Sequence, residues 1–484
     1  MRFHVFLAMA LLLWPMSDMA VAQEITRCLN AEGRTVYTTT PARDCDAEGG
    51  GVKIAIEAYA KGDYDTAAEI CTRWAERGDS LCSFLLGRMN LRGESFPINP
   101  RGAMEHFQRA AAIGLAHANT ALGQMYAEGI GVAVNDSEAI QALRRAVDRD
   151  NAEAQYRLAV LNATGRGMRN PNPEVALELF LQAANNDEWY ADEQNRQIFG
   201  AEHLQEIRGL AQLEVAIAYA EGIGVQRNDQ EAVNWYQAAA ENGNAIAQNN
   251  LGNRYNVGRG VPQDYAEARR WYRRAAEQGL AVAQNSLGVM LEQGLGGPPA
   301  PREATYWYDQ AAEQGLAIAQ NNAGKMYAEG RGVPRNDSRA FERFQEAADQ
   351  GLPEAQYNLG RMYAEGRGRT RDERLAMQLF NLAANRGSLL AMYEIGNMLA
   401  KRGGPRDYRE AAVWYRRAAE REHVDSMFRL GIIYAEGLID GTPVVEEAVV
   451  WLRNACQAGH AEACQKLSDV QVNHSAAGLP RASS

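Results

Sequence analysis

The chain has 484 residues, a formal net charge of −11 and only six Cys. An apolar fraction of 46% and a charged fraction of 23% are those of a globular protein and exclude wholesale disorder. The acidic balance argues against a nucleic-acid-coating role, six Cys are too few for a disulfide lattice, and the length alone suggests three or four domains of about 150 residues each.

The first 22 residues have the features of a cleaved export signal. Arg2 precedes an apolar run over Val5–Trp14 that is short for a membrane span, so a signal peptide is favoured over the alternative, an N-terminal membrane anchor. The small residues Ala20 and Ala22 predict cleavage after Ala22. We therefore expect an exported protein without membrane insertion after cleavage.

Residues 23–51 predict a small Cys-bearing β-hairpin cap followed by a Gly linker. Thr26–Leu29 and Arg34–Thr39 flank Asn30–Gly33, which is a turn-forming tetrad. Cys28 and Cys45 could close a loop of 17 residues, which the chain-entropy treatment values at about 3 kcal/mol. The alternative is an unstructured spacer.

This stretch resembles a small domain of unknown function that follows the signal peptide in proteobacterial envelope proteins. The residues that carry the resemblance are Cys28, Gly33, Arg34, Tyr37 and Pro41. The resemblance implies a Gram-negative periplasm as the destination, with secretion as the alternative.

A 36-residue repeat occupies most of the chain. A small residue recurs at one register position, with steps of 36 except for 57 between Ala159 and Ala216 and 35 at the end. The register residues are Gly87, Gly123, Ala159, Ala216, Gly252, Gly288, Gly324, Gly360, Gly396 and Gly431. Fixed self-similarity of this length predicts a solenoid rather than separate domains.

Each repeat has the pattern of two helices joined by short glycine turns. A first helix, such as Ala281–Glu292, contains the register Gly and ends at a Gly-x-Gly pair that suits left-handed caps. Asp264 or Asp407 is expected to cap the second helix. Gly inside a helix costs about 1 kcal/mol relative to Ala, so its recurrence indicates close packing. We predict an all-α, right-handed α-solenoid of about ten repeats.

The pattern resembles the Sel-1-like repeat family, which is related to tetratricopeptide repeats. The residues that carry it include Leu122, Gly123, Tyr126, Gly129, Gly131 and Val132, and in another repeat Ala268, Trp271, Tyr272, Ala275, Ala276 and Gly279. The resemblance covers residues 52–468, with an insertion near 187–208, and leaves 469–484 as a disordered tail. In the repeat of Gly396, Arg402 replaces the first loop glycine.

Two further cysteine pairs lie in the predicted array. Cys456 and Cys464 join the end of one helix to the start of the next, and they are similar to the bridged Sel-1-like repeats of secreted cysteine-rich proteins, which implies a disulfide. Cys71 and Cys82 flank the turn at Gly78 and form either a bridge or two buried thiols.

The sequence gives little indication of catalysis. The Gly-x-Gly pairs follow helices and lack phosphate-loop continuations, and the seven His show no zinc spacing. None of the five Lys stands three residues after a Ser, as serine-based β-lactam chemistry requires. We predict that the protein is not an enzyme and has no cofactor or metal.

In helix-pair solenoids the first helices line the concave face, so exposed positions near each register residue are candidates for binding. Amide and Tyr side chains there suit hydrogen bonding to an extended peptide, although any Asn could instead serve a neighbouring turn. The candidates are Tyr156, Asn249, Asn285, Asn321, Tyr357 and Tyr393 before the register residue, and Asn253, Lys325, Arg361 and Asn397 after it.

These observations predict a non-catalytic exported scaffold or adaptor that binds other cell-envelope proteins or peptides, and no nucleic acid, through the concave surface. One alternative is a bridged repeat protein that binds, and in one form hydrolyses, peptidoglycan or β-lactams. The other is a structural spacer within an envelope complex.

Overall fold

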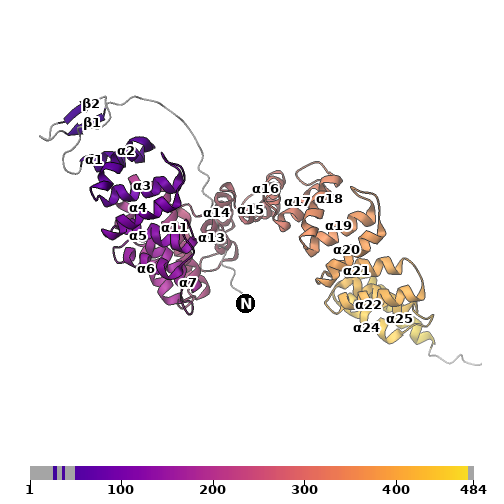
Figure 1. Ribbon diagram of the computed structural model, residues 1–484. Coiled ribbons are helices and arrows are strands. Elements are labelled where there is room, and N and C mark those ends of the chain that lie inside the picture. The colour runs from indigo at the N-terminus through magenta and orange to yellow at the C-terminus, as the bar shows by residue number, and fades with distance from the viewer. Residues whose placement is uncertain (1–25, 30–34, 39–49, 478–484) are drawn as a thin grey trace, which may run out of the picture. The chain divides into compact units, whose positions relative to one another are not determined.

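The computed structural model describes residues 26–29, 35–38 and 50–477, and it divides into unit 1, up to Gln226, and unit 2, from Arg227 (Figure 1). Strands β1 (Thr26–Leu29) and β2 (Thr35–Thr38) pair antiparallel, with Cys28 opposite Val36. The predicted signal peptide, the turn at 30–33, Cys45 and residues 478–484 lie outside the described residues. The hairpin cap and the Cys28–Cys45 bridge therefore remain predictions.

Unit 1 is a succession of antiparallel helix pairs with one insertion. Its helices are α1 (Gly50–Ala60), α2 (Tyr64–Glu76), α3 (Ser80–Arg92), α4 (Pro100–Ala112), α5 (Ala116–Glu128), α6 (Asp136–Val147), α7 (Ala152–Thr164), α8 (Pro173–Ala184), α9 (Asp187–Ala191), α10 (Glu193–Phe199) and α11 (Ala201–Glu221).

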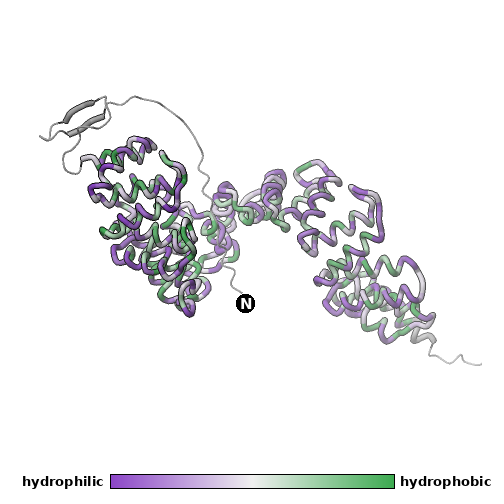
Figure 2. Tube along the Cα trace, in the orientation of Figure 1, coloured by the Kyte–Doolittle hydropathy of each residue, from purple (hydrophilic) through white to green (hydrophobic). Residues whose placement is uncertain are grey.

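Unit 2 continues the pairs without an insertion. Its helices are α12 (Asp229–Glu241), α13 (Ala245–Val257), α14 (Tyr265–Glu277), α15 (Ala281–Gln293), α16 (Pro301–Glu313), α17 (Ala317–Glu329), α18 (Asp337–Asp349), α19 (Pro353–Glu365), α20 (Glu373–Asn385), α21 (Leu389–Ala400), α22 (Pro405–Ala419), α23 (Val424–Ala435), α24 (Val445–Gln457) and α25 (Ala461–Ala477). Apolar and polar residues alternate along these helices, as an inward face and an outward face require (Figure 2).

The register glycine lets the two helices of a pair approach closely. A Cβ on Gly288 would lie 2.7 Å from the ring of Tyr308, a side chain that is fully buried in the second helix. The same conflict arises between Gly324 and Phe344, at 2.6 Å. The close packing that the sequence indicated is therefore a glycine–aromatic contact in most pairs, whereas Gly123 and Gly431 face a leucine instead.

The two glycines of each loop have different tasks. Gly330 is the left-handed cap residue of α17, with φ of 70°, as the sequence predicted. Gly332 has φ of 74° and lies against the first turn of α16 in the preceding repeat, where a Cβ would be 2.5 Å from Arg302 N. The second glycine therefore permits contact between successive repeats.

One capping prediction holds and another is wrong. The side chain of Asp264 accepts hydrogen bonds from Ala266 N and Glu267 N at the start of α14. Asp407 does not cap α22, because that helix begins at Pro405 and Gly404 is its N-cap residue. Proline suits the first helical position, since its missing N–H would have no intrahelical partner there.

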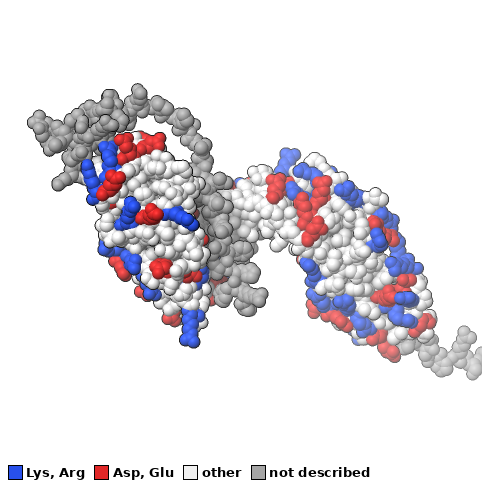
Figure 3. Space-filling model, viewed as in Figure 1, with Lys and Arg blue, Asp and Glu red and all other residues white. Residues whose placement is uncertain are grey.

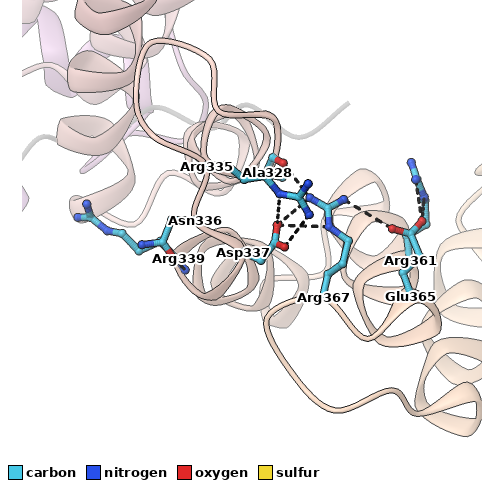
Figure 4. A network of polar contacts seen from close by, with 8 residues as sticks. All are labelled: Ala328, Arg335, Asn336, Asp337, Arg339, Arg361, Glu365 and Arg367. Carbon is cyan, nitrogen blue, oxygen red and sulfur yellow. Dashed lines mark hydrogen bonds and ion pairs between the residues drawn. The ribbon is translucent and has the colours of Figure 1, made fainter.

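Polar contacts also join successive repeats. Buried Gln284 donates to Ala276 O, and it accepts from Gln314 at 2.9 Å. In the loop after α19, Arg367 donates to Asp337 of α18 at 2.8 Å and to Ala328 O at 2.7 Å (Figure 4). These hydrogen bonds hold successive repeats together in addition to the apolar contacts of the core.

The first and last described helices of the array, α1 and α25, run slightly past the expected limits at residues 52 and 468. Gly51 in α1 lies one 36-residue step before Gly87, and a Cβ there would overlap the ring of Trp74, so α1 and α2 form one more degenerate pair. Helix α25 continues to Ala477, so the boundary expected at residue 468 lies inside this helix.

Candidate binding surface

The candidate residues lie on the first helices of the pairs, which we call the first-helix surface of each unit. Tyr156 belongs to α7 in unit 1, and the remaining candidates belong to α13, α15, α17, α19 and α21 in unit 2. In the unit 2 helices the register glycine faces the paired second helix, and this fixes the direction of the candidate side chains around each helix. A residue three before the register position lies about 60° from it around the helix, and a residue one after it lies about 100° away, so these side chains border the interface with the second helix.

The amide candidates form contacts between repeats. Asn322 donates to Asn285 Oδ1 at 3.0 Å, and Asn358 donates in the same way to Asn321 Oδ1 at 2.9 Å. Asn321 is only 3% exposed. The carbonyl oxygens of Asn285 and Asn321 are thus engaged by asparagines of the next first helix, and not by a neighbouring turn.

The pattern of amide contacts ends at Asn249. Its Oδ1 is buried and has no hydrogen-bond partner among the described residues. Ser286 stands where an Asn would donate to it, and the Ser286 hydroxyl donates to Val282 O instead. Asn249 therefore presents an unsatisfied acceptor, which carries a free-energy cost in the unbound protein.

The remaining unit 2 candidates differ in how far they are engaged. Asn253 and Asn397 accept hydrogen bonds from the buried hydroxyls of second-helix tyrosines, at 2.6 and 2.7 Å. Lys325 is exposed. Tyr393 is half-buried, and its ring lies 5.3 Å from His423. Asn253 and Lys325 are therefore exposed among these four, and Asn253 is also engaged by a tyrosine hydroxyl.

Tyr357 and Arg361 form a pair on α19. The half-buried Tyr357 packs against Phe380 with ring centres 5.9 Å apart, and the Arg361 guanidinium lies 6.0 Å from the Tyr357 ring centre. Arg361 also forms an exposed ion pair with Glu365 at 2.8 Å (Figure 4). Hydrogen bonding to Glu365 raises the pKa of Arg361, so the guanidinium remains charged at neutral pH.

An apolar row on the first-helix surface was missed by the sequence analysis. Ile246, Val282 and Ile318 lie six residues before successive register glycines, and they are 40%, 49% and 52% exposed. Leu390 has the same position and is 49% exposed. The signal was present in the sequence, because these residues share the 36-residue spacing, but only the turns next to the register residue were considered.

In unit 1 the insertion covers the first-helix surface. Trp189, Tyr190, Leu204 and Ile207 form one apolar cluster with α7, and Tyr156 packs against it. Helix α10 also contacts α1, which is distant in sequence. Tyr156 is therefore occupied by the chain itself, and burial raises its pKa to about 12.

Arg88 and Phe199 form the centre of this contact. The Arg88 guanidinium lies 4.7 Å from the Phe199 ring centre, and Arg88 Nη1 donates to Ile198 O at 2.6 Å. The Phe199 ring also lies 6.1 Å from Phe84 and 5.1 Å from His117. Arg88 thus satisfies a carbonyl at the end of α10, where the helix dipole favours a cation.

A buried charge network holds the next part of the insertion. Glu153 is 7% exposed and lies 2.7 Å from Arg157 and 3.8 Å from His203. Burial opposes the charged form of His203, but its contacts with Glu153 and Glu206 outweigh burial and raise the pKa of His203 to about 9. Burial lowers the pKa of His117 to about 4, so the two histidines carry different charges at pH 7.

The cysteine pairs in the array have different states. Cys456 and Cys464 form a disulfide between α24 and α25. Cys71 and Cys82 are buried and unbonded, with their Sγ atoms 2.6 Å apart, which is shorter than a normal contact between two thiols. The bridge between Cys71 and Cys82 remains a prediction.

Other kinds of site have no support in the described part of the chain. None of its helices combines the length and apolar character that a bilayer span requires. No group of three or more His, Cys, Asp and Glu side chains within it is placed to hold a metal ion. On the visible face of each unit, basic and acidic side chains are interspersed rather than gathered into one field (Figure 3).

The fold and this surface define a helical repeat scaffold, and the chain belongs to the Sel1 repeat family, as the sequence pattern indicated. The family matches at residues 80–115, 116–151, 152–188, 209–244, 245–280, 281–316, 317–352, 353–388, 389–423 and 424–460. Sel1 repeats generally mediate protein–protein interaction.

Individual relatives show how far this similarity extends. The crystal structure of c5321, a protective antigen of uropathogenic Escherichia coli strains with an SLR fold, is 28% identical with a TM-score of 0.75, over 83% of this chain and 82% of that one. A Sel1 repeat protein from Oxalobacter formigenes is 30% identical, over 67% of this chain and 87% of that one, with a TM-score of 0.47. The alginate biosynthesis protein AlgK of Azotobacter vinelandii is 34% identical over 96 residues, which are 20% of this chain and 21% of that protein.

Proposed function

We propose that the protein is a non-catalytic exported scaffold that binds cell-envelope proteins or peptides through the first-helix surface of unit 2. The observation that carries this proposal is the exposed apolar row of Ile246, Val282 and Ile318, which lies one helical turn from the amide row. Apolar side chains repeated on one face supply contact area, and neighbouring amides supply directional hydrogen bonds.

The periplasm is the proposed location, with secretion as the alternative. The support is the signal-like segment at residues 1–22, which lies outside the described residues, and the resemblance of residues 28–41 to an envelope domain. The similarity of part of the chain to an alginate biosynthesis protein is compatible with an envelope role. We also propose, from the sequence, that the array winds with a right-handed twist and that a β-hairpin caps its N-terminal end.

A crosslinking pull-down from the periplasm of the native host tests the proposal. We expect the wild-type protein to capture specific envelope proteins, and the double variant Val282→Asp, Ile318→Asp to lose them. Val413→Asp is the matched control, because Val413 is 56% exposed on the second helix α22. All these substitutions are at exposed sites, so each variant should keep the wild-type circular dichroism spectrum.

The alternatives give different results in the same experiments. Turnover of a chromogenic β-lactam by the pure protein, or a covalent adduct, would favour the β-lactam-binding alternative. Retention of all partners by the double variant would favour a spacer that uses other surfaces. Capture of no protein above background by the wild type would contradict the scaffold proposal.

A further inference from the structure

The contact between the insertion and unit 1 uses side chains at fixed register positions. Phe84 lies three residues before the register Gly of its repeat, and Arg88 lies one residue after it. His117 lies six residues before the next register residue, and Glu153 lies six before the one after that. These four side chains meet Phe199 and His203 of the insertion.

Unit 2 repeats the same arrangement of positions. Tyr357 and Arg361 stand three residues before and one residue after Gly360, and Leu390 and Asp425 stand six residues before the next two register residues. Among the ten register positions, only those of Gly87 and Gly360 combine an aromatic residue before with Arg after. The side-chain geometry agrees, since the guanidinium lies 5.9 Å from the ring centre in unit 1 and 6.0 Å in unit 2.

The two surfaces differ in what covers them. In unit 1, Arg88 and Glu153 are each 7% exposed beneath the insertion. In unit 2, the side chains of Arg361 and Asp425 are 46% and 58% exposed, and Leu390 is 49% exposed. The present partners of the two unit 2 charges are the exposed Glu365, at 2.8 Å, and the half-buried His460, at 3.6 Å.

We propose that Tyr357, Arg361, Leu390 and Asp425 form a binding site for a segment of a partner protein. This segment contains a helix whose last two residues are an aliphatic residue and an aromatic residue. A basic residue follows about one helical turn further along the chain. The insertion supplies the pattern of this ligand. Ile198 gives the carbonyl to arginine, Phe199 gives the ring, and His203 gives the charge that faces the carboxylate. Arg361 would exchange Glu365 for the free carbonyls at the end of the helix, and Asp425 would receive the basic group.

This inference rests on the proposed function and names the class of partner. Exposed ion pairs of the Arg361–Glu365 kind contribute little to stability, so a ligand can displace this one at small cost. Burial of Leu390 and of the open face of Tyr357 favours binding.

The test uses a fluorescein-labelled peptide of residues 187–208 as the probe, with the full chain as the receptor and fluorescence anisotropy as the readout. We expect saturable binding with a Kd below about 1 mM, and a loss of affinity of at least about tenfold on Arg361→Glu or Leu390→Asp. The matched control is Arg374→Glu, because Arg374 is exposed on the second helix α20 of the same repeat and should leave affinity within about twofold.

A charge exchange tests the carboxylate position independently. The peptide with His203→Glu should bind the wild-type protein at least about tenfold more weakly and should regain affinity for the Asp425→Lys protein. Absence of saturable binding, or binding that Arg361→Glu leaves unchanged, overturns the inference. If the peptide does not bind while Val282→Asp, Ile318→Asp still abolishes partner capture, the proposed function stands and this site is wrong.

Discussion

Replacing Gly332 with Ala tests whether the second loop glycine carries the contact between successive repeats. Gly332 has φ of 74°, and its α-carbon faces the backbone at the start of α16, which belongs to the preceding repeat. The matched variant is Gly315→Ala in the turn between α16 and α17. Gly315 has φ of 86°, but an added Cβ would meet no atom within 4 Å.

Both variants are destabilised by an Ala in a left-handed backbone conformation, but only Gly332→Ala also creates a steric conflict. An Ala in the left-handed region costs about 1–2 kcal/mol, and this cost applies to both. At Gly332 the new Cβ would also lie 2.5 Å from Arg302 N, so the first turn of α16 must retreat by about 1 Å to restore normal contact. Overpacking of this kind costs about 1–3 kcal/mol, so Gly332→Ala should be less stable than Gly315→Ala by that amount.

Hydrogen exchange read by mass spectrometry is the suitable assay, because repeat arrays open locally and not in one cooperative step. Since about 1.4 kcal/mol corresponds to a tenfold change in an opening equilibrium, Gly332→Ala should speed exchange in α16 by roughly ten- to hundredfold over Gly315→Ala. Equal exchange in the two variants would refute the assignment of the second glycine to contact between repeats.

Three further predictions concern charge and covalent links. Hydrogen bonds from two loop arginines lower the pKa of Asp337 to about 2. The stability that the ionised carboxylate contributes is therefore present above the unfolded pKa near 3.9 and is lost as pH falls through about 2. After solvent screening we expect a contribution of about 1 kcal/mol to the free energy of unfolding in urea at pH 5, and no such contribution in Asp337→Asn. Reduction of Cys456–Cys464, which lie 8 residues apart, should destabilise α24 and α25 by about 2.5 kcal/mol, measurable as faster hydrogen exchange confined to these helices. The charged His203 side chain stabilises the fold fully below about pH 6.5, and this stabilisation is lost as pH rises through its folded pKa of about 9. Trp189 fluorescence should therefore change between these pH values in the wild type but not in His203→Gln.

The repeat and its local turns were predictable because each depends on one residue type at one spacing. A register glycine excludes a Cβ that would meet the paired helix, and a loop glycine permits a positive φ, so the 36-residue pattern contains both. The failure of Asp407 to cap α22 was not predictable from spacing alone, because Pro405 starts that helix two residues earlier. The second task of Gly332 was also missed, since the backbone that it meets belongs to another repeat.

The candidate surface was predictable only in part. Residues next to the register position were found from the spacing, but two of the amide side chains serve neighbouring repeats, and the exposed apolar row one turn earlier was overlooked. The docking of the insertion had no sequence signal, because Arg88 and Ile198 are 110 residues apart and the insertion does not repeat. Contacts of this kind depend on shape and charge after folding rather than on periodicity.

The two units show how one repeat pattern can give a filled surface and an open surface. In unit 1 the insertion is joined to the chain at both ends, so its effective concentration at Arg88 greatly exceeds that of any dissolved peptide, and external ligands are at a disadvantage there. In unit 2 the equivalent Arg361 forms a surface ion pair, which a ligand can replace without breaking the core. If this reasoning is right, Phe199→Ala, which weakens the internal contact, should let the labelled peptide bind at unit 1 as well and add a second binding event that Arg361→Glu does not remove.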